Sequence, residues 1–252
     1  MFLNPNFSFN GKYSKDMNVS ICSLNQDLIN KIGINYASNI TLENELNKYN
    51  PFYSETYSQP ETIELNLLLY DSNTMQPLEK DDYDIEELYD WLITDYFAPF
   101  ISDDDTDMIY YFKVVNISKM LTYEGRGYLV VTFQPYTKYC YKRVVQELSI
   151  ASQASIEIYN PSREAYKPII EVTNRGDEKT VIKINDMEIT ELAKYETVTI
   201  DNLTKIIVNE KNENKYANCN RKWIELEPRK NNVLNLDGVC AIKIICEFPL
   251  LR

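Results

Sequence analysis

The acidic run between Asp103 and Asp107 holds the densest group of metal-ligand side chains in the sequence. Asp103, Asp105 and Asp107 place carboxylates at alternate positions, as calcium-binding loops do at their start. Such a loop also needs a glycine at its sixth position and a glutamate at its twelfth, where Met108 and Val114 stand instead. The sequence therefore favours a solvated turn over a calcium site.

Trp223 and Glu225 form a second candidate site, because a tryptophan flanked by polar side chains can stack on a sugar ring. Both lie in the segment RKWIELE, which alternates polar and apolar residues like a strand. A tryptophan that faces the core fits the same pattern, since the two residues share an exposed face only if the strand is regular and faces solvent. Both interpretations stay open on the sequence alone.

The sequence contains no histidine. This absence removes Ser-His triads, imidazole general bases and most transition-metal sites at once. Paired carboxylates of a glycosidase must face each other across a cleft, which spacing along a β protein cannot reveal. We therefore expect no catalytic, metal-binding or cofactor-binding residue, and a protein that is not an enzyme.

The cysteines are Cys22, Cys140, Cys219, Cys240 and Cys246, an odd set without a C-x-x-C pair. This spacing disfavours a zinc site or a disulfide framework. It predicts buried thiols in a reducing cytoplasm.

The charge balance argues against a nucleic-acid ligand. The chain has 26 basic and 38 acidic residues, a formal net charge of −12, and no stripe of Lys and Arg for duplex phosphates. It has no run of about 18 apolar residues, and its first residues lack a basic segment followed by an apolar one. We expect no stable nucleic-acid binding, no membrane insertion and no export through a signal peptide.

Short strands and tight turns are expected in the first half of the chain. Residues 7–11, FSFNG, alternate phenylalanine with polar residues and end in Asn10-Gly11, a strong signal for a two-residue hairpin turn. Three later runs of alternating, β-branched or aromatic residues also predict strands: 62–70, 109–117 and 128–133.

One helix is expected before the second of these runs. Asp84 and Glu87 have the three-residue spacing of a helix N-terminus whose side chains satisfy the first amides. Apolar residues then recur three or four apart as far as Tyr96. Pro99 is expected to stop the helix.

The character of the sequence changes near Ala151, where we place a domain boundary. Roughly nine short strands separated by turn residues follow in about 100 residues, without a helical period, which predicts a two-sheet sandwich or jelly roll. They are 154–160, 168–174, 179–185, 187–190, 196–201, 205–210, 222–227, 232–236 and 241–248. The sequence thus predicts a mostly β protein with domains 1–150 and 151–252.

Taken together, these residues resemble the distal tail (Dit) proteins of phages that infect Gram-positive bacteria. The order and spacing of several signatures carry the resemblance, beginning with F-x-F-N-G-x-x-S-x-D, which ends here in Ser14 and Asp16. The later signatures are Leu88, Trp91 and Leu92 on the helix, the strand Tyr110–Val114, the strand from Gly127 to Pro135 and Tyr136, Pro168–Val172, the turn near Asn185, and Thr199–Asp201.

The resemblance implies a structural protein of the phage tail tip. Its N-terminal domain, a β-barrel or sandwich with one helix, builds a homo-hexameric hub ring, and a galectin-like β-sandwich projects outward. The ring joins the major tail tube protein to the tip, a tail-associated lysin or a receptor-binding protein, and leaves a channel through which DNA passes. The implied location is the virion, with assembly in the host cytoplasm.

An assembly interface is expected at the N-terminal hairpin, because an apolar hairpin at a chain end is easily shared between subunits. Tyrosine and tryptophan enrichment also suits subunit contacts, since amphipathic rings bury area and keep a hydrogen bond. The candidate residues are Phe7, Phe9, Asn10, Gly11 and Trp91.

A carbohydrate-binding, receptor-recognition module is the alternative function. Galectins use a His-x-Asn-x-Arg strand and a Trp-Gly-x-Glu segment. This chain has no histidine and has Ile224 after Trp223, so only Trp223 and Glu225 match. The chain also lacks the glycine that the Dit family often has after Pro228, and it has no long insertion of the kind that carries sugar-binding modules in some relatives.

Overall fold

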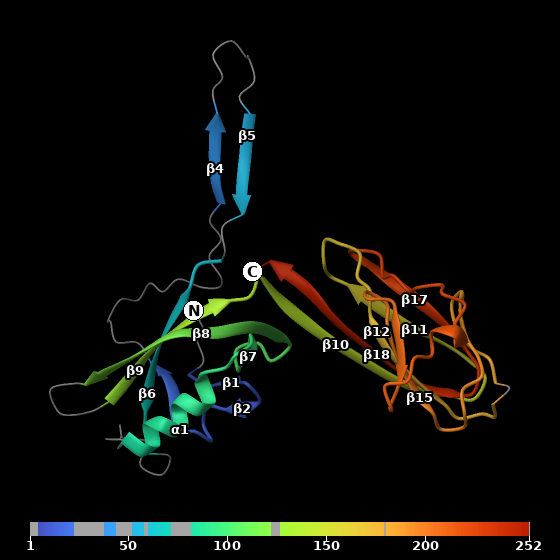
Figure 1. The fold of residues 1–252 in the computed structure, drawn as a ribbon, viewed down its shortest axis with the longest axis horizontal. Coiled ribbons are helices and arrows are strands. Elements are labelled where there is room, and N and C mark those ends of the chain that lie inside the picture. Colours follow the sequence, from blue (N-terminus) through green and yellow to red (C-terminus); the bar gives the residue numbers. More distant parts are fainter. Residues whose placement is uncertain are drawn as a thin grey trace. The chain divides into compact units, whose positions relative to one another are not determined.

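The computed structural model describes residues 5–22, 38–43, 52–57, 60–71, 82–121, 127–178 and 180–251 (Figure 1). The chain divides into two compact units: the first is Met1–Cys140 with Leu251–Arg252, and the second is Tyr141–Leu250. The predicted boundary near Ala151 lies later, at the end of strand β10 (Tyr139–Ile150). Because β10 pairs with β18 (Cys240–Leu251), most of it belongs to the second unit.

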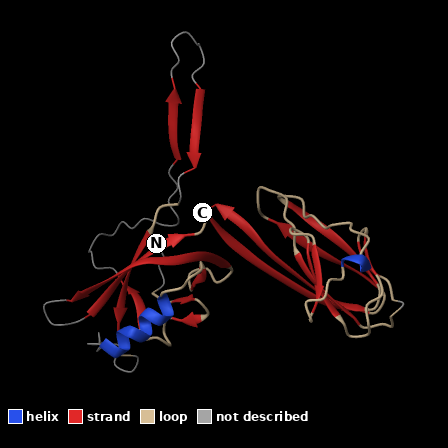
Figure 2. Cartoon of the chain, viewed as in Figure 1, coloured by secondary structure: helices blue, strands red, loops and turns tan. Residues whose placement is uncertain are grey.

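Strands dominate both units, as predicted (Figure 2). Within the described ranges α1 (Asp82–Leu92) is the one α-helix, and η1 (Tyr216–Asn218) is a short 3-10 helix. The strands of the first unit are β1 (Phe7–Phe9), β2 (Lys12–Tyr13), β3 (Val19–Cys22), β4 (Ser38–Glu43), β5 (Phe52–Tyr57), β6 (Ile63–Leu69), β7 (Ala98–Ser102), β8 (Met108–Leu121) and β9 (Gly127–Pro135). An antiparallel sheet runs in the order β2-β1-β7-β8-β9-β6-β3, and β4 pairs separately with β5. The predicted N-terminal hairpin and the strands at 62–70, 109–117 and 128–133 are confirmed.

Ser14 ties the N-terminal hairpin to the next strand. The amide of Phe7 donates to Ser14 Oγ at 3.1 Å, and the amide of Ser14 donates to the Phe7 carbonyl at 2.8 Å. The Ser14 carbonyl accepts from the amide of Val19, the first residue of β3, at 2.9 Å. Ser14 is fully buried, so its hydroxyl satisfies the Phe7 amide, a backbone group that would otherwise be costly to bury.

The helix α1 ends earlier than the sequence pattern predicts. Leu88, Trp91 and Leu92 are buried on its inner face, but Tyr96 lies beyond the helix and is 55% exposed. Pro99 does not stop the helix, because it lies within β7. The side chain of the predicted cap Asp84 lies outside the described residues.

Phenylalanine rings build the core of the first unit. Phe100 packs against Phe7 and Phe112 with ring centroids 5.0 and 5.2 Å apart. Phe133 lies 5.5 Å from Phe9 and 5.7 Å from Phe112. These separations are those of favourable aromatic pairs, and all five rings are fully buried.

The second unit is a two-sheet sandwich, as predicted. Its further strands are β11 (Gln153–Asn160), β12 (Ile169–Asn174), β13 (Ile182–Ile184), β14 (Met187–Ile189), β15 (Thr197–Asp201), β16 (Ile206–Asn209) and β17 (Lys230–Asp237). One sheet has the order β16-β15-β12-β18-β10 and the other the order β11-β17-β13-β14. Isoleucine, valine and leucine side chains from both sheets form its core, because alternate residues of each strand point inward.

The predicted strand at 222–227 is wrong. Arg221 has a left-handed φ of 65°, so the chain turns just before this segment. The amide of Ile224 donates to Asn202 Oδ1 at 2.8 Å, and the amide of Glu227 donates to Asn232 Oδ1 at 2.7 Å. Asparagine side chains thus take the amides that a strand ladder would need.

Asparagines fix the other loops of the second unit in the same way. Buried Asn174 donates from Nδ2 to the carbonyls of Leu192 and Asp177 at 2.7 and 2.9 Å. Its Oδ1 accepts from the amide of Gly176 at 2.9 Å. Asn160, Asn202, Asn209 and Asn232 make similar side-chain bonds to loop backbone.

Candidate assembly surface and polar pocket

The Asn10-Gly11 turn presents backbone in a left-handed conformation at the surface. The φ angles are 49° at Asn10 and 75° at Gly11, which suit a tight hairpin turn. A Cβ at Gly11 would meet no heavy atom within 4 Å, so the backbone angle rather than crowding favours glycine. The Asn10 amide donates to the Pro99 carbonyl at 3.0 Å, which holds the turn against β7.

Phe7, Phe9 and Trp91, three of the five predicted interface residues, are core residues in this fold. Trp91 Nε1 donates to the Phe9 carbonyl at 2.8 Å, and its ring lies 5.8 Å from that of Phe7. Buried rings are not available for direct contact with a partner. They fix the position of the turn, and Asn10 and Gly11 remain as surface candidates.

Aromatic side chains that sequence reasoning did not select lie beside this turn. The Tyr96 hydroxyl donates to Asn10 Oδ1 at 2.7 Å. The next residue, Phe97, has its ring 5.0 Å from that of Tyr136, which is 60% exposed. The helical spacing of apolar residues predicts Tyr96 on the buried stripe, although Thr94 already interrupts the apolar run there.

Backbone hydrogen bonds connect the segments that carry these residues. Pro99 accepts from the Asn10 amide and pairs with Tyr111 across β7 and β8. The Tyr111 carbonyl accepts from the Tyr136 amide at 2.9 Å. We use the name turn surface for the residues that these contacts connect: Asn10, Gly11, Tyr96, Phe97 and Tyr136.

Trp223 and Glu225 lie on an extended segment of the second unit, but not as an open stacking platform. Trp223 is half-buried against the core, with its ring 6.0 Å from that of Tyr216. The guanidinium of Arg221 lies 4.8 Å from the Tyr216 ring centroid. Glu225 is exposed and lies 4.0 Å from the Lys167 ammonium.

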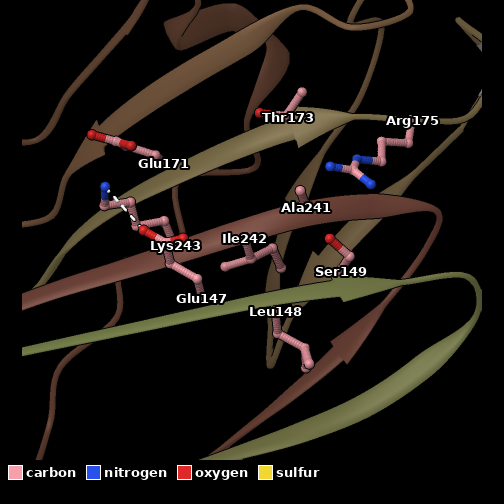
Figure 3. Close-up of a pocket in the computed structure, with 9 residues that line it drawn as sticks. All are labelled: Glu147, Leu148, Ser149, Glu171, Thr173, Arg175, Ala241, Ile242 and Lys243. Atoms are coloured by element: carbon pink, nitrogen blue, oxygen red, sulfur yellow. Dashed lines mark ion pairs between the residues drawn. The ribbon is translucent and has the colours of Figure 1, made fainter.

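A pocket of about 360 Å³ lies on the sheet face formed by β10, β18 and β12 (Figure 3). Its polar side chains are Glu147, Ser149, Glu171, Thr173, Arg175 and Lys243. Figure 3 shows the ion pair of Lys243 with Glu147, which measures 3.0 Å. Sequence reasoning missed this pocket, because its residues come from strands far apart in the sequence and meet only through the sheet register.

The acidic turn uses carboxylates in internal hydrogen bonds. The Tyr13 hydroxyl donates to Asp103, and this bond raises the pKa of Tyr13 to about 12. The Ser102 hydroxyl donates to Asp104 at 3.2 Å. In the described parts of the chain, no group of three or more His, Cys, Asp or Glu side chains could hold a metal ion.

The predicted burial of the thiols is confirmed for Cys140, Cys219, Cys240 and Cys246, and Cys22 is half-buried. Burial raises the pKa of Cys240 to about 11 and that of Cys246 to about 12. These groups stay as inert thiols at neutral pH.

Within the residues that the structure describes, α1 is too short and too polar to cross a membrane.

Two family models match the chain. The model described as phage tail protein N-terminal domain matches residues 3–136, and the model described as phage tail C-terminal domain matches residues 139–246. A comparison with curated protein sequences found no match.

Two solved structures are similar over nearly the whole chain. The first is the Dit (gp 19.1) protein of phage SPP1, described as a paradigm of the hub adsorption apparatus in phages that infect Gram-positive bacteria. It is 13% identical, with a TM-score of 0.59 over 96% of this chain and 98% of that chain. The second, a chain of the phage p2 baseplate in its activated conformation with Sr, is 11% identical, with a TM-score of 0.50 over 95% and 97%.

At these identities the likeness is one of fold, and it confirms the predicted Dit-like architecture. The chain belongs to the phage tail protein family that the two models describe.

Proposed function

We propose that this chain is the hub of a phage tail. Six copies form a ring that joins the tail tube to the tip or adsorption apparatus and leaves a channel for DNA. The observation that carries the proposal is the exposed turn surface, which lies on the unit that the N-terminal family model matches. The fold likeness to a hub protein supports it.

The turn surface has the chemistry of a subunit contact. Tyr96 and Tyr136 are large, more than half exposed and backed by a rigid aromatic core. Tyrosine is enriched at interfaces because its ring buries apolar area while its hydroxyl keeps a hydrogen bond. A ring also needs a different second patch on each subunit, since only a heterologous contact repeats around a closed ring.

Charge explains how DNA would pass through such a ring. With −12 on each chain, six copies carry a formal 6 × −12 = −72. A neutral or acidic channel wall offers few phosphate contacts, so DNA slides without being held. Tight duplex binding by assembled rings at about 0.15 M salt would refute this part of the proposal.

The partners follow from the position of a hub. The ring contacts the major tail tube protein on one side and the tip, a tail-associated lysin or a receptor-binding protein on the other. The assembled protein resides in the virion, and its assembly takes place in the host cytoplasm. The proposal assigns the chain no catalytic step, so purified chain should not lyse cell walls.

Truncation of the two tyrosines tests the interface. The double variant Tyr96→Ala/Tyr136→Ala should lose six-copy particles, because central aromatic side chains each contribute on the order of 2 kcal/mol to a contact. Tyr195→Ala is the matched control, since Tyr195 is 67% exposed on the second unit. Unchanged assembly in the double variant would remove the turn surface from the interface.

Carbohydrate recognition by the second unit is the alternative function. The half-buried Trp223 with nearby Glu225, and the polar pocket on the sheet, favour it. A glycan array probed with the full chain tests it, with Trp223→Ala as the variant that should lose binding. Glycan binding that survives this substitution would exclude Trp223 from a sugar site.

A further inference from the structure

A row of apolar side chains crosses the outward face of the larger sheet of the second unit. Ile169 of β12 pairs with Ile245 of β18, and Val145 lies on the neighbouring strand β10 (Figure 1). Val145 is 43% and Ile169 37% exposed. Sheet faces that meet solvent usually carry polar side chains at such positions.

Ion pairs flank this apolar row on both sides. Glu147 Oε1 lies 3.0 Å from Lys243 Nζ, and Arg143 Nε lies 3.9 Å from Glu247 Oε1. Residue 147 of β10 pairs with residue 243 of β18, and residue 143 pairs with residue 247, so the two strands run antiparallel. In this register Val145 lies beside Ile245, between the two ion pairs. The face thus has an apolar centre and a charged rim, the usual anatomy of a protein interface.

The two flanking pairs carry no net charge, whereas the whole chain carries −12. A strongly acidic protein repels its own copies. A neutral face is therefore where two copies approach with least repulsion.

The order of the charges makes the face complementary to itself. Each ion pair forms a row of two charges across the two strands. The first row has the negative Glu147 on β10 and the positive Lys243 on β18. The second row has the positive Arg143 on β10 and the negative Glu247 on β18. A second copy can be turned over by a two-fold rotation about an axis along the apolar side chains. The first charged row of each copy then lies over the second charged row of the other copy. Glu147 then faces Arg143 of the second copy, and Lys243 faces Glu247.

The register on β12 extends the pattern. Glu171 pairs with Lys243 and continues the first row. Two residues before Ile169, Lys167 stands on the side of Glu247, although it also lies 4.0 Å from Glu225. The contact ends at β15, where Asp201, which pairs with Ile169, would face its own copy.

We propose that this face of β10, β18 and β12 is a two-fold interface between two copies of the chain. Val145, Ile245 and Ile169 each meet their own counterpart, and the four charges of β10 and β18 meet opposite charges. A two-fold contact of this kind is closed, so it joins copies only in pairs. It lies on the second unit and does not depend on the turn surface, so copies that belong to different rings would pair through it.

The contact is small. Three strands about 4.8 Å apart and about five residues at 3.4 Å give a few hundred Å² per copy, below the usual size of a stable interface. A single pair of chains should therefore associate weakly, with a dissociation constant on the order of 0.1 mM or above. Several such contacts acting together between rings would be much stronger.

Chemical crosslinking in the full chain tests the geometry. A cysteine at position 145 lies on the two-fold axis, so Val145→Cys should be trapped as a pair by a short bismaleimide crosslinker. Val233→Cys on the opposite sheet is the matched control, since Val233 is 49% exposed. Both are made with Cys22→Ser, because the other native thiols are buried. We expect crosslinking at position 145 to be at least about tenfold faster than at position 233. This ratio corresponds to a free-energy preference of roughly 1.4 kcal/mol.

Charge reversal tests the complementarity. Arg143→Glu/Glu247→Arg keeps an ion pair within the chain but reverses its row, so like charges then face each other between copies. It should reduce crosslinking at position 145 to the control rate, and adding Glu147→Lys/Lys243→Glu should restore it. If the first double variant misfolds by circular dichroism, Glu147→Lys/Lys243→Glu alone makes the same test.

Equal crosslinking rates at positions 145 and 233 would overturn the proposal. It would also be overturned if reversing the charges of one ion pair left the crosslinking rate at position 145 unchanged. The ring proposal is judged separately, because it predicts sixfold mass and sensitivity to Tyr96 and Tyr136 rather than pairing and sensitivity to β10 and β18.

Discussion

The two units of this chain build their cores and hold their loops with different side chains. The first packs phenylalanine rings and Trp91 around the N-terminal hairpin. The second packs isoleucine, valine and leucine between two sheets and fixes its loops with asparagine side chains.

The different side chains indicate different structural roles for the two units. Stacked rings hold one exposed turn rigidly, which lowers the cost of ordering it on binding. The second unit positions many loops without using apolar area, because each asparagine satisfies several backbone groups at once. The first unit should therefore be most sensitive to ring truncation, and the second also to loss of single amides and to acid.

The chain has two tryptophans, and each unit contains one of them. A Trp223→Phe background leaves Trp91 to report on the first unit, and a Trp91→Phe background leaves Trp223 to report on the second. Denaturant unfolding followed by fluorescence can thus measure each unit separately.

The largest effect is expected for Phe100→Ala. The ring is fully buried between Phe7 and Phe112, and such truncations cost about 3–5 kcal/mol. The Trp91 transition should move to lower denaturant while the Trp223 transition stays in place. Equal shifts of both transitions would show that the units do not unfold separately.

Leu236→Ala should destabilise the second unit by about 2–5 kcal/mol, since Leu236 is buried on β17 in the sandwich core. The Trp223 transition reports this loss. Val233→Ala on the same strand is the control, because its exposed side chain should change stability by less than about 0.5 kcal/mol. A similar cost for both would contradict the assignment of the core.

Asn174→Ala should cost the second unit about 1–3 kcal/mol, because it leaves the buried carbonyl of Leu192 without its donor. The same Trp223 measurement applies. The exposed Asn231→Ala should be neutral. A neutral Asn174→Ala would mean that the loop is held by other contacts.

Acid should weaken the second unit through Glu196. Burial opposes ionisation of this carboxyl, but hydrogen bonds from Lys215, Asn209 and the Ala193 amide lower its pKa from 4.5 to about 2. A depressed pKa contributes stability above about pH 4.5, and this is lost as the pH falls toward 2.

The effect should be about 1 kcal/mol, measured as the shift of the Trp223 urea transition between pH 5 and pH 3. Glu196→Gln should remove that part of the pH dependence. An unchanged pH dependence in this variant would assign it to other carboxyls.

Local patterns predict much of this fold. The Asn10-Gly11 dipeptide and the alternation of 62–70 predict their hairpin and strand because turn angles and strand period depend on neighbouring residues alone. The same holds for the short strands of the second unit, except at 222–227. There the deciding contacts come from Asn202 and Asn232, which no local pattern around Trp223 reveals.

The sites depend on contacts that sequence spacing does not encode. The alternation of Phe7 and Phe9 with polar residues predicts a strand, but whether their rings face the core or a partner is decided by α1, which brings Trp91 over Phe9. The pocket joins Glu147, Glu171 and Lys243 only through strand register. Tyr136 reaches Phe97 in the same way, across β7, β8 and β9.

The mass and shape of the purified chain, by light scattering with negative-stain imaging of the same sample, test the central proposal most directly. We predict particles of six times 29.6 kDa, with a central hole and with loss of the ring in Tyr96→Ala/Tyr136→Ala. A chain that shows no six-copy particles, either alone or after mixing with the tail tube protein, would contradict the hub proposal.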